Sequence, residues 1–530
     1  MNEKDVEAAG RPHDVATVRI SDPIPRSKGK KSLSFYMSIL MLAMIALIVS
    51  WDVTALSLAL PVIANRLGGT NFQSFWASIA FILGIAVTQP IYSSISDVMG
   101  RKQVLYVAIA LFGVGCIVFA TAKDMSTIIV GRLIKGLGAG GLDVLQTMIL
   151  CDITTMKERA RWLGVLSSAN AVGAVTGPFI GGAFAQDVGW PWLGWINLIA
   201  AGITGVLTFF FLHLTPIEGD LKTKARKLDW SGFALFTIIG TIIALPLSWG
   251  NTLYPWGSWR TLVPLLIGIV LLISFGFVEK RATAPMIPYK IFDNISFITG
   301  IVSGFLYGSL LNPVLLYLPL FYQAVYLETP IVAAKSILPL CCLVVSASII
   351  ASIIIEWSRK YRATLWTGWI LSTVFMGLLY IIGGYVYQTF LGAGLGTALM
   401  ATMIATLASV TSVDNEGLAA GMLVTSRFLG SLIGLAVCST VFSSAFGARL
   451  AASIGDLPPE LETLRDPSQA VQFIEKLRSV SVSPEVLQNT VWIVLMAFSG
   501  FAALISVFTR ENSLEKSEIG RQGLQTSAAE

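Results

Sequence analysis

Long apolar runs, separated by short polar connections, constrain this chain more than any other feature. A helix needs about 20 mostly apolar residues to cross the hydrocarbon core of a bilayer, and fourteen runs meet this requirement. Their expected bounds are 35–60, 74–96, 103–121, 126–150, 162–185, 191–214, 231–250, 261–279, 296–321, 331–355, 363–384, 387–411, 418–446 and 490–509. The runs do not alternate in polarity as the strands of a membrane barrel do. The sequence therefore predicts an all-α integral membrane protein with fourteen transmembrane helices.

Composition narrows the possible functions. Only 13% of the residues are charged and 55% are apolar, whereas an ordinary soluble domain carries about 25% charged residues. This balance excludes a soluble enzyme, a disordered chain and a nucleic-acid binder. The five cysteines lie in apolar stretches without metal-ligand spacing, and His13 and His213 are the two histidines. We therefore expect no cofactor and no metal site.

The distribution of Lys and Arg predicts the orientation in the membrane. Loops after even-numbered runs carry fifteen of these residues, and short loops after odd-numbered runs carry four, counting one at a run end. Because short basic loops stay in the cytoplasm, both termini are expected there. Residues 1–34 are then a cytosolic tail rather than a cleaved signal peptide, and 510–530 form a second one. The segment 448–490 is an extracytosolic loop, in which 456–466 and 470–479 are expected to be short surface helices.

An internal repeat divides the chain into two halves. The triplet Gly136, Gly138 and Gly140 returns 256 residues later as Gly392, Gly394 and Gly396. A pair of glycines, Gly173 and Gly177, returns 257 residues later as Gly430 and Gly434, and Asp97 matches Glu356 at 259. Carriers often contain two halves of similar plan. We therefore expect six-helix bundles over 35–214 and 296–509, with a cytosolic linker and two inserted spans over 215–295.

Several motifs occur in one order along the chain. They are WDVTALSLALP (51–61), SSISDVMGRK (93–102), GRLIKGLGAGG (131–141) and GAVTGPFIGG (173–182). Together they resemble the major facilitator superfamily, in particular its fourteen-helix drug:proton antiporter group as found in fungi, over about residues 40–445. Two positions depart from the pattern, since Ser93 replaces a glycine and Lys135 stands where glutamine is usual. The resemblance implies a two-bundle efflux pump that exchanges protons for small organic molecules, but it names no substrate.

Four charged residues lie inside apolar runs: Asp52, Arg132, Lys135 and Asp143. A charge at the bilayer centre costs about 2.5–3.5 kcal/mol and usually marks an ion or substrate path. Arg132 and Asp143 are eleven residues apart and share a helix face, and the four charges sum to zero. We expect them to neutralise one another across a central cavity. Protonation of Asp52 would then release Arg132 and couple protons to substrate.

Two alternatives remain for these charges. The four residues can instead form a fixed ion-pair network that only holds two helices together. Lys135 can serve as a permanent counter-ion, or it can bias the pocket toward anionic substrates.

The Gly-Pro motif predicts an antiporter hinge at Gly173, Gly177, Pro178, Gly181 and Gly182. Glycines four residues apart let helices approach closely, and proline removes one backbone hydrogen bond. This combination suits a pivot at the interface of the two halves. The alternative is ordinary tight packing.

A cytosolic gate is predicted at Asp97, Gly100, Arg101 and Lys102. Asp97 can pair with neighbouring cations, and Gly100 allows the tight turn. A solvated positive-inside loop is the alternative. Arg427, near the inner end of its run, either anchors that helix or extends to the interface, and the sequence leaves its role undecided.

The most consistent interpretation is a secondary active exporter, not an enzyme, because no catalytic or phosphate-cradling constellation is visible. It would act as a monomer in the lipid bilayer, exchanging protons for an organic amphiphile such as a drug, a toxin or a secondary metabolite. We expect the plasma membrane, with the vacuolar membrane as the alternative. Two rivals remain: an importer or facilitator for a nutrient or siderophore, and a non-transporting receptor with a carrier fold.

Overall fold

The computed structural model describes thirteen segments of the chain. They are 31–68, 71–184, 188–217, 220, 228–250, 254–281, 289–326, 332, 335–381, 385–410, 415–453, 490–514 and 522–524. The tail 1–30 and the two predicted surface helices at 456–466 and 470–479 lie outside these residues. Every regular element longer than one residue in the described part is helical.

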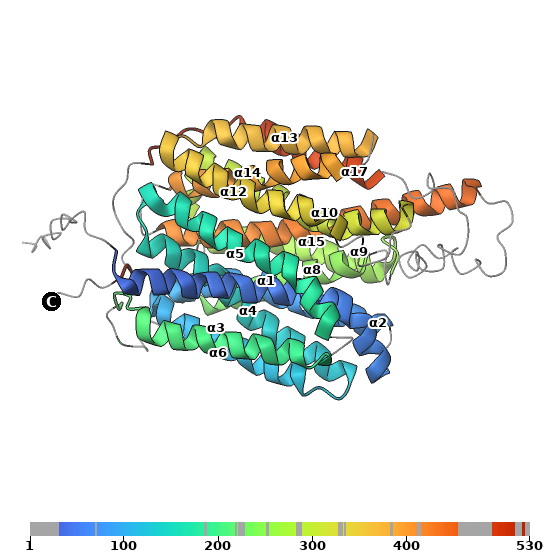
Figure 1. Ribbon diagram of the computed structural model, residues 1–530, viewed down its shortest axis with the longest axis horizontal. Helices are drawn as coiled ribbons and strands as arrows, with labels where there is room; N and C mark the ends of the chain where they lie inside the picture. The colour runs from blue at the N-terminus through green and yellow to red at the C-terminus, as the bar shows by residue number, and fades with distance from the viewer. Residues whose placement is uncertain are drawn as a thin grey trace, which may run out of the picture.

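Six long helices are described in the N-terminal half, and they run roughly along the long axis of the molecule (Figure 1). They are α1 (Leu33–Leu67), α2 (Asn71–Met99), α3 (Arg101–Ala120), α4 (Met125–Ile153), α5 (Met156–Ala183) and α6 (Trp192–Phe211). Polar caps begin two of them, since Ser32 accepts a hydrogen bond from the Phe35 amide and Asp124 accepts one from the Thr127 amide. Gly68 ends α1 at φ 63°, a conformation that suits glycine.

Six long helices are described in the C-terminal half. They are α10 (Ile295–Val325), α12 (Leu338–Ser358), α13 (Arg362–Ile381), α14 (Tyr385–Ala408), α15 (Glu416–Ser453) and α17 (Thr490–Ser506). The N-terminal end of α1 and the C-terminal segment of the chain lie at the same end of the bundle (Figure 1). We call this end the terminal end. The two halves contact each other mainly through α5 with α12, and through α2 and α4 with α15.

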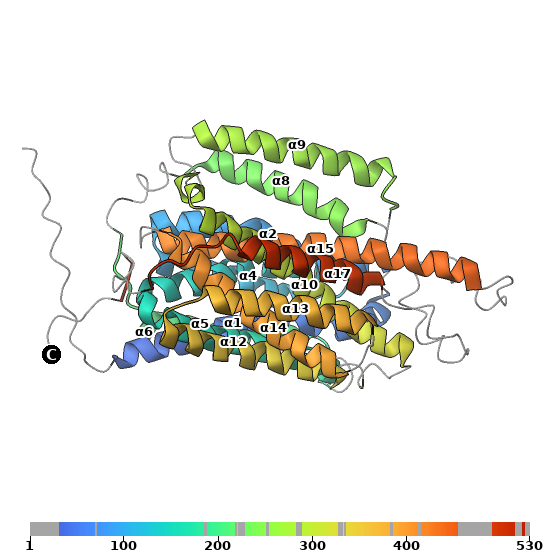
Figure 2. The ribbon, with the colours of Figure 1, turned by 90° about the horizontal axis from the view of Figure 1, so that it is seen from above.

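Two further helices lie beside the bundle. After α6, α8 (Trp230–Trp249) and α9 (Trp259–Arg281) pack against each other, and a short 3-10 helix, Tyr289–Asp293, precedes α10. Figure 2 shows the pair on one side of the molecule, with α8 nearer the bundle than α9. α8 contacts α2 and α15, one helix from each half.

The repeated glycines make equivalent contacts in the two halves. A Cβ on Gly138 of α4 would collide with Phe112 of α3, and a Cβ on Gly394 of α14 would lie 2.6 Å from the Ser372 amide nitrogen of α13. Gly136 likewise faces α2 and Gly392 faces α12. Since only glycine permits such close backbone approach, the repeated glycines show that α4 and α14 pack against their neighbours in equivalent ways.

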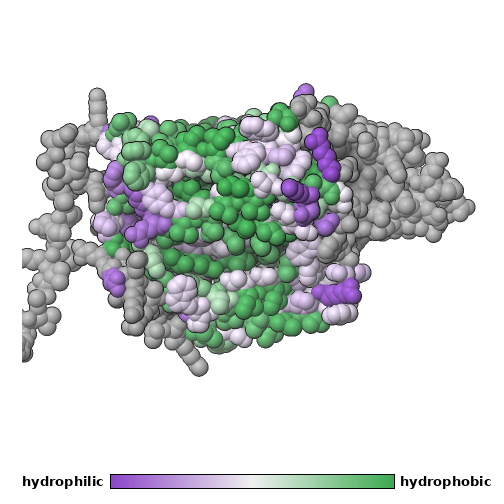
Figure 3. Space-filling model, turned by 90° about the horizontal axis from the view of Figure 1, so that it is seen from below, coloured by the Kyte–Doolittle hydropathy of each residue, from purple (hydrophilic) through white to green (hydrophobic). Residues whose placement is uncertain are grey.

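The predicted number of fourteen spans is not confirmed. Each predicted run overlaps one helix of the described part, although several runs extend beyond the helix ends. Twelve of these helices are long and apolar enough to cross a membrane. The two others are α4, which carries several charges, and α17, which has 17 residues. Figure 3 shows, on the face in view, mostly apolar residues across the middle of the molecule and hydrophilic residues toward both ends. An all-helical, multi-pass membrane protein is therefore the supported fold class.

Candidate functional site

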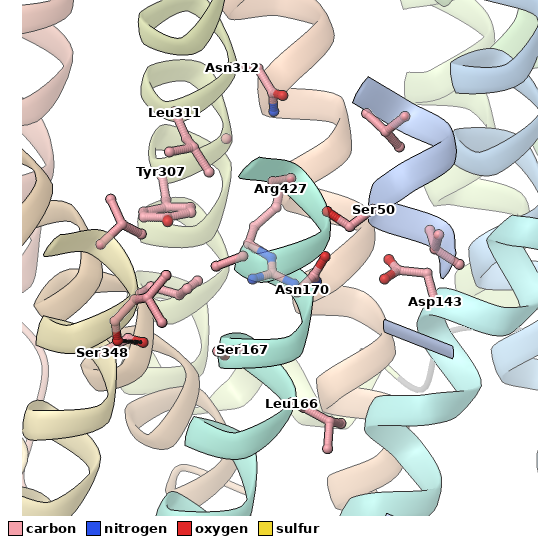
Figure 4. Close-up of a pocket in the computed structure, with 18 of the residues that line it drawn as sticks. Ser50, Asp143, Leu166, Ser167, Asn170, Tyr307, Leu311, Asn312, Ser348 and Arg427 are labelled. Atoms are coloured by element: carbon pink, nitrogen blue, oxygen red, sulfur yellow. Dashed lines mark hydrogen bonds between the residues drawn. The ribbon is translucent and has the colours of Figure 1, made fainter. Parts of the chain in front are cut away.

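A cavity lies between the two halves (Figure 4). α1, α4 and α5 line it from the N-terminal half, and α10, α12, α14 and α15 line it from the C-terminal half. It encloses about 240 Å³. Leu166, Leu311, Val344 and Phe428 contribute apolar walls. Pockets between packed helices, mostly apolar with a few polar groups, are typical small-molecule sites.

One charged residue from each half lines this cavity, Asp143 on α4 and Arg427 on α15, and no other charged residue is among its described lining. Figure 4 shows Asp143 and Arg427 on opposite sides, with Ser50 between them in this view. No ion pair joins them within 4.0 Å. The cavity therefore holds two separated charges of opposite sign.

Asp143 is buried, with 7% of its surface exposed, and its carboxylate is held by two amides. Gln89 Nε2 donates to Oδ2 at 2.9 Å, and Gln146 Nε2 donates to Oδ1 at 3.0 Å. Both amides belong to the N-terminal half. They orient the carboxylate without adding a positive charge.

Polar groups without partners face the same space. The Tyr307 hydroxyl, on a side chain that is 3% exposed, makes no hydrogen bond within the described part of the chain, and neither does Gln146 Oε1. The Arg427 side chain also forms no hydrogen bond or ion pair with any described residue. The role of Arg427 was not predictable from the sequence, and Tyr307 was not among the predicted site residues, because a tyrosine in an apolar helix carries no pattern that indicates a cavity.

The expectation that four charges neutralise one another across the cavity is wrong. Asp52 lies in a separate cluster away from the cavity lining, where its Oδ2 accepts from Arg132 Nη1 at 2.7 Å and its Oδ1 pairs with Lys135. Asn197 of α6 donates to Oδ1 at 2.9 Å. Arg132 and Asp143 share a helix face, but eleven residues place them about 16 Å apart along the axis. They therefore meet different neighbours.

The Asp52 cluster is buried and carries one more positive than negative charge. Arg132 is 3% exposed and Lys135 is 1% exposed. The Arg132 guanidinium lies 4.2 Å from the centre of the Phe81 ring, and Lys135 Nζ lies 5.3 Å from that of Phe112. Aromatic faces stabilise desolvated cations and so offset part of the unbalanced charge.

The predicted hinge glycines pack within one half rather than between the halves. A Cβ on Gly173 would lie 2.7 Å from the Leu47 carbonyl oxygen, and a Cβ on Gly177 or Gly181 would collide with Thr54 or Ala55 of α1. Pro178 and Gly182 lie within the same helix, α5. The glycine stripe therefore holds α5 against α1, and a pivot at these residues stays a prediction.

Two of the four predicted gate residues, Asp97 and Arg101, belong to an ion-pair network at the terminal end. Arg101, which is 2% exposed, pairs with Asp97 at 2.6 Å and with Asp152 at 2.9 Å. Gly100 adopts φ 105°, which favours glycine. Lys102 donates instead to the Phe209 carbonyl at 3.4 Å. The alternative of a solvated positive-inside loop does not fit Arg101, because this residue is buried and paired.

Two contacts at this end were missed from the sequence. Arg159 of α5 and Glu416 of α15 form an ion pair of 2.5 Å between the halves, with both side chains almost fully buried. Gln522, near the C-terminus, accepts from the Arg101 amide at 2.8 Å and donates to the Ser96 carbonyl at 3.3 Å. Both contacts join residues more than 250 positions apart, so no local pattern signals them.

The chain is similar to several known carriers. The family model described as Major Facilitator Superfamily matches residues 42–435. The "MFS-type transporter sphD" of Aspergillus fumigatus is 39% identical, over 98% of this chain and 93% of its own length. The "Efflux pump FUS6" of Gibberella moniliformis is 31% identical, over 93% and 91% of the two chains. Among solved structures, the proton:xylose symporter XylE shares 12% identity with a TM-score of 0.59, covering 91% of this chain and 98% of its own, so the likeness is one of fold.

Proposed function

The chain belongs to the major facilitator superfamily, and we propose that it exports small organic amphiphiles in exchange for protons by alternating access. The cavity between the halves carries this proposal, because its two charges come from opposite halves and its remaining wall is largely apolar. Movement of one half against the other would change both the access to this cavity and the separation of its charges. The name of the relative "Efflux pump FUS6" favours export, and the cargo that we propose is a drug, a toxin or a secondary metabolite.

The proton step needs a buried carboxylate that can be neutralised. A buried carboxylate without a cation takes up a proton more readily than one held between two cations. Asp143 has two amide partners and faces the cavity, whereas Asp52 is held by Arg132 and Lys135. We therefore assign the proton to Asp143, in place of Asp52, and treat the Asp52 cluster as the link between α1 and α4.

Exchange then follows from competition. An antiporter must not carry its proton and its substrate together, because otherwise the gradient would drive import. A substrate group that binds the ionised Asp143 carboxylate is displaced when that carboxylate is protonated. Protons entering from outside would release substrate there, and loss of the proton to the cytosol would restore the site.

The test uses purified protein in liposomes with an imposed pH gradient, an internal pH dye and a panel of amphiphiles and siderophores. We expect substrate-dependent proton flux in the wild type and none in Asp143→Asn, whose neutral side chain carries no proton and lacks the charge that binds the substrate. Full proton flux in Asp143→Asn, with loss in Asp52→Asn, would move the proton to Asp52. Substrate flux without protons in the wild type would contradict antiport and support a facilitator.

We further propose that the protein is a monomer in the plasma membrane with both termini in the cytosol. The excess of Lys and Arg in the loops after the even-numbered runs supports this orientation, and Arg101 and Lys102 of one such loop lie at the terminal end. A fluorescent protein fused to the C-terminus would show in which membrane the protein resides. Protease protection of that tag in sealed vesicles of known sidedness reports the orientation.

A further inference from the structure

We propose that the cavity binds a zwitterionic head group, with an acidic group of the substrate on Arg427 and an ammonium group on Asp143. The substrate class would be an amphiphile with an amino-acid-like head and an apolar chain. This inference rests on the proposed function, because it names the substrate of the same cavity. Four observations carry it.

The first observation is the unused hydrogen-bonding capacity of Arg427. A guanidinium has five N–H donors in a planar fork that matches a carboxylate. In the part of the chain that the structure describes, Arg427 donates none of them to a side chain or carbonyl. Its side chain points into the cavity (Figure 4). A bidentate acidic group would use these donors.

The second observation is the Tyr307 hydroxyl. This group is buried on the same side of the cavity as Arg427 (Figure 4), and no described residue satisfies it. Buried polar groups in native proteins almost always have partners. An acidic group bound to Arg427 would accept a hydrogen bond from this hydroxyl, in addition to two from the guanidinium.

The third observation is the remaining capacity of Asp143. An ionised carboxylate offers about four lone-pair sites, and the two glutamine amides occupy one on each oxygen. The others are available to an ammonium group. Ser50 and Asn170 lie between the two charges in Figure 4 and can bind further polar atoms of the head group.

The fourth observation is the charge balance of the cavity. A substrate with a single charge would compensate either Arg427 or Asp143 and leave the other desolvated without a counter-ion, which is strongly unfavourable. A head group that carries both charges compensates both residues at once. The apolar wall, which includes Leu166, Leu311 and Val344, would then contact the chain of the amphiphile.

This arrangement also explains how a proton excludes the substrate. Protonation of Asp143 removes the partner of the ammonium group, while Arg427 continues to hold the acidic group weakly. The zwitterion is then released, as exchange requires. A purely acidic substrate would bind better after protonation and would move together with the proton.

Binding to purified wild-type protein in detergent, without any gradient, tests the proposal. The four probes share one chain length and differ in charge. They are 2-aminodecanoate, which carries both charges, decanoate, which is negative, decylamine, which is positive, and decanamide, which is neutral. We expect 2-aminodecanoate to bind about tenfold or more tightly than each of the other three, since each charged contact adds about that factor. Equal binding of all four probes would overturn the proposal. So would the absence of 2-aminodecanoate binding at concentrations up to about 10 mM, which corresponds to a binding free energy of about 3 kcal/mol.

Variants separate the two contacts. In Arg427→Gln, 2-aminodecanoate should fall to the affinity of decylamine, and in Asp143→Asn it should fall to that of decanoate. The affinity of decanamide should not change in either variant. Arg260→Gln is the matched control, because this cation lies at the start of α9, outside the described cavity lining. If each cavity variant weakens all four probes equally, the two residues act on the fold, and the proposal is wrong.

The two proposals can fail separately. Selective binding of 2-aminodecanoate without proton movement in liposomes would contradict export by proton exchange and leave the head-group assignment intact. Proton-coupled efflux of neutral amphiphiles, with no selectivity among the four probes, would contradict the head-group assignment and leave export by proton exchange intact.

Discussion

Arg159 of α5 and Glu416 of α15 form a buried ion pair that joins the two halves at the terminal end, with Nη1 and Oε2 2.5 Å apart. Arg159 also donates to the carbonyls of Cys151 and Thr154, at 2.7 and 2.9 Å. Removal of one partner of a buried ion pair destabilises the folded protein by about 3–5 kcal/mol, because the other charge stays buried without a counter-charge. The pair is therefore well placed to hold this end of the cavity shut.

Removal of the Glu416 charge should open the terminal end. Glu416→Gln leaves the Arg159 guanidinium buried without a counter-charge, so separation of the halves becomes easier. Cys151, which is 1% exposed, provides the readout. In a background where it is the sole cysteine, we expect its labelling by a water-soluble maleimide to accelerate at least about tenfold, which corresponds to about 1.4 kcal/mol.

Glu158→Gln is the matched control for this experiment. Glu158 also lies at the start of α5, but its pair with Lys31 is partly exposed and does not join the halves, so the expected effect on labelling is small. A reporter with Cys116 as the sole cysteine, in the interior of the N-terminal half, detects unfolding. Equal Cys151 labelling rates in the two variants would show that the Arg159 pair does not hold the halves together.

The unbalanced charge of the Asp52 cluster predicts opposite outcomes for two substitutions. Asp52→Asn leaves Arg132 and Lys135 buried without an anion and should lower stability by about 3–5 kcal/mol. Lys135→Gln leaves Asp52 paired with Arg132 and should be neutral or stabilising. The double variant should regain part of the loss, and thermal unfolding followed by tryptophan fluorescence measures all three. Similar losses in Lys135→Gln and Asp52→Asn would mean that the second cation is required.

The glycine stripe of α5 predicts a selective rescue. Gly177→Ala would collide with the Thr54 hydroxyl, whereas Gly181→Ala would collide with the backbone carbonyl of Ala55. Each should destabilise by about 1–3 kcal/mol. Thr54→Ala removes the first obstacle but not the second, so it should restore Gly177→Ala alone. Restoration of both variants, or of neither, in thermal unfolding would contradict the packing of α5 on α1.

The contact of Gln522 with the Arg101 loop predicts a role for the C-terminal segment. Gln522→Ala removes two hydrogen bonds and leaves the buried Arg101 amide without an acceptor, a loss of about 1–3 kcal/mol. We expect faster maleimide labelling of Cys151, by about fivefold or more. Thr121→Val is the control, because its hydroxyl bonds only the Ile117 carbonyl of its own helix, at the opposite end of α3. Unchanged labelling in Gln522→Ala would show that the segment rests on this loop without stabilising it.

The sequence predicted helices well where apolar length decides the outcome, and it predicted the repeat because glycines report close packing directly. It predicted the pairing of Asp52 with Arg132, since charged residues within apolar helices usually pair with one another. It failed for Asp143, because a shared face does not mean a shared neighbour when two residues are three turns apart. The role of Arg427 was undecidable, because a lone cation near a helix end suits both an anchor and a cavity.

The sequence alone determined that this chain is a multi-pass helical membrane protein of a two-bundle family, because hydropathy and motifs depend on residues close together along the chain. Only the tertiary structure decided which charges face the cavity and which are paired behind it. It also brought Arg159 to Glu416 and Gln522 to Arg101. These contacts depend on the rotation of each helix against its neighbours and on the docking of two halves that are hundreds of residues apart, and no local pattern in the sequence encodes either.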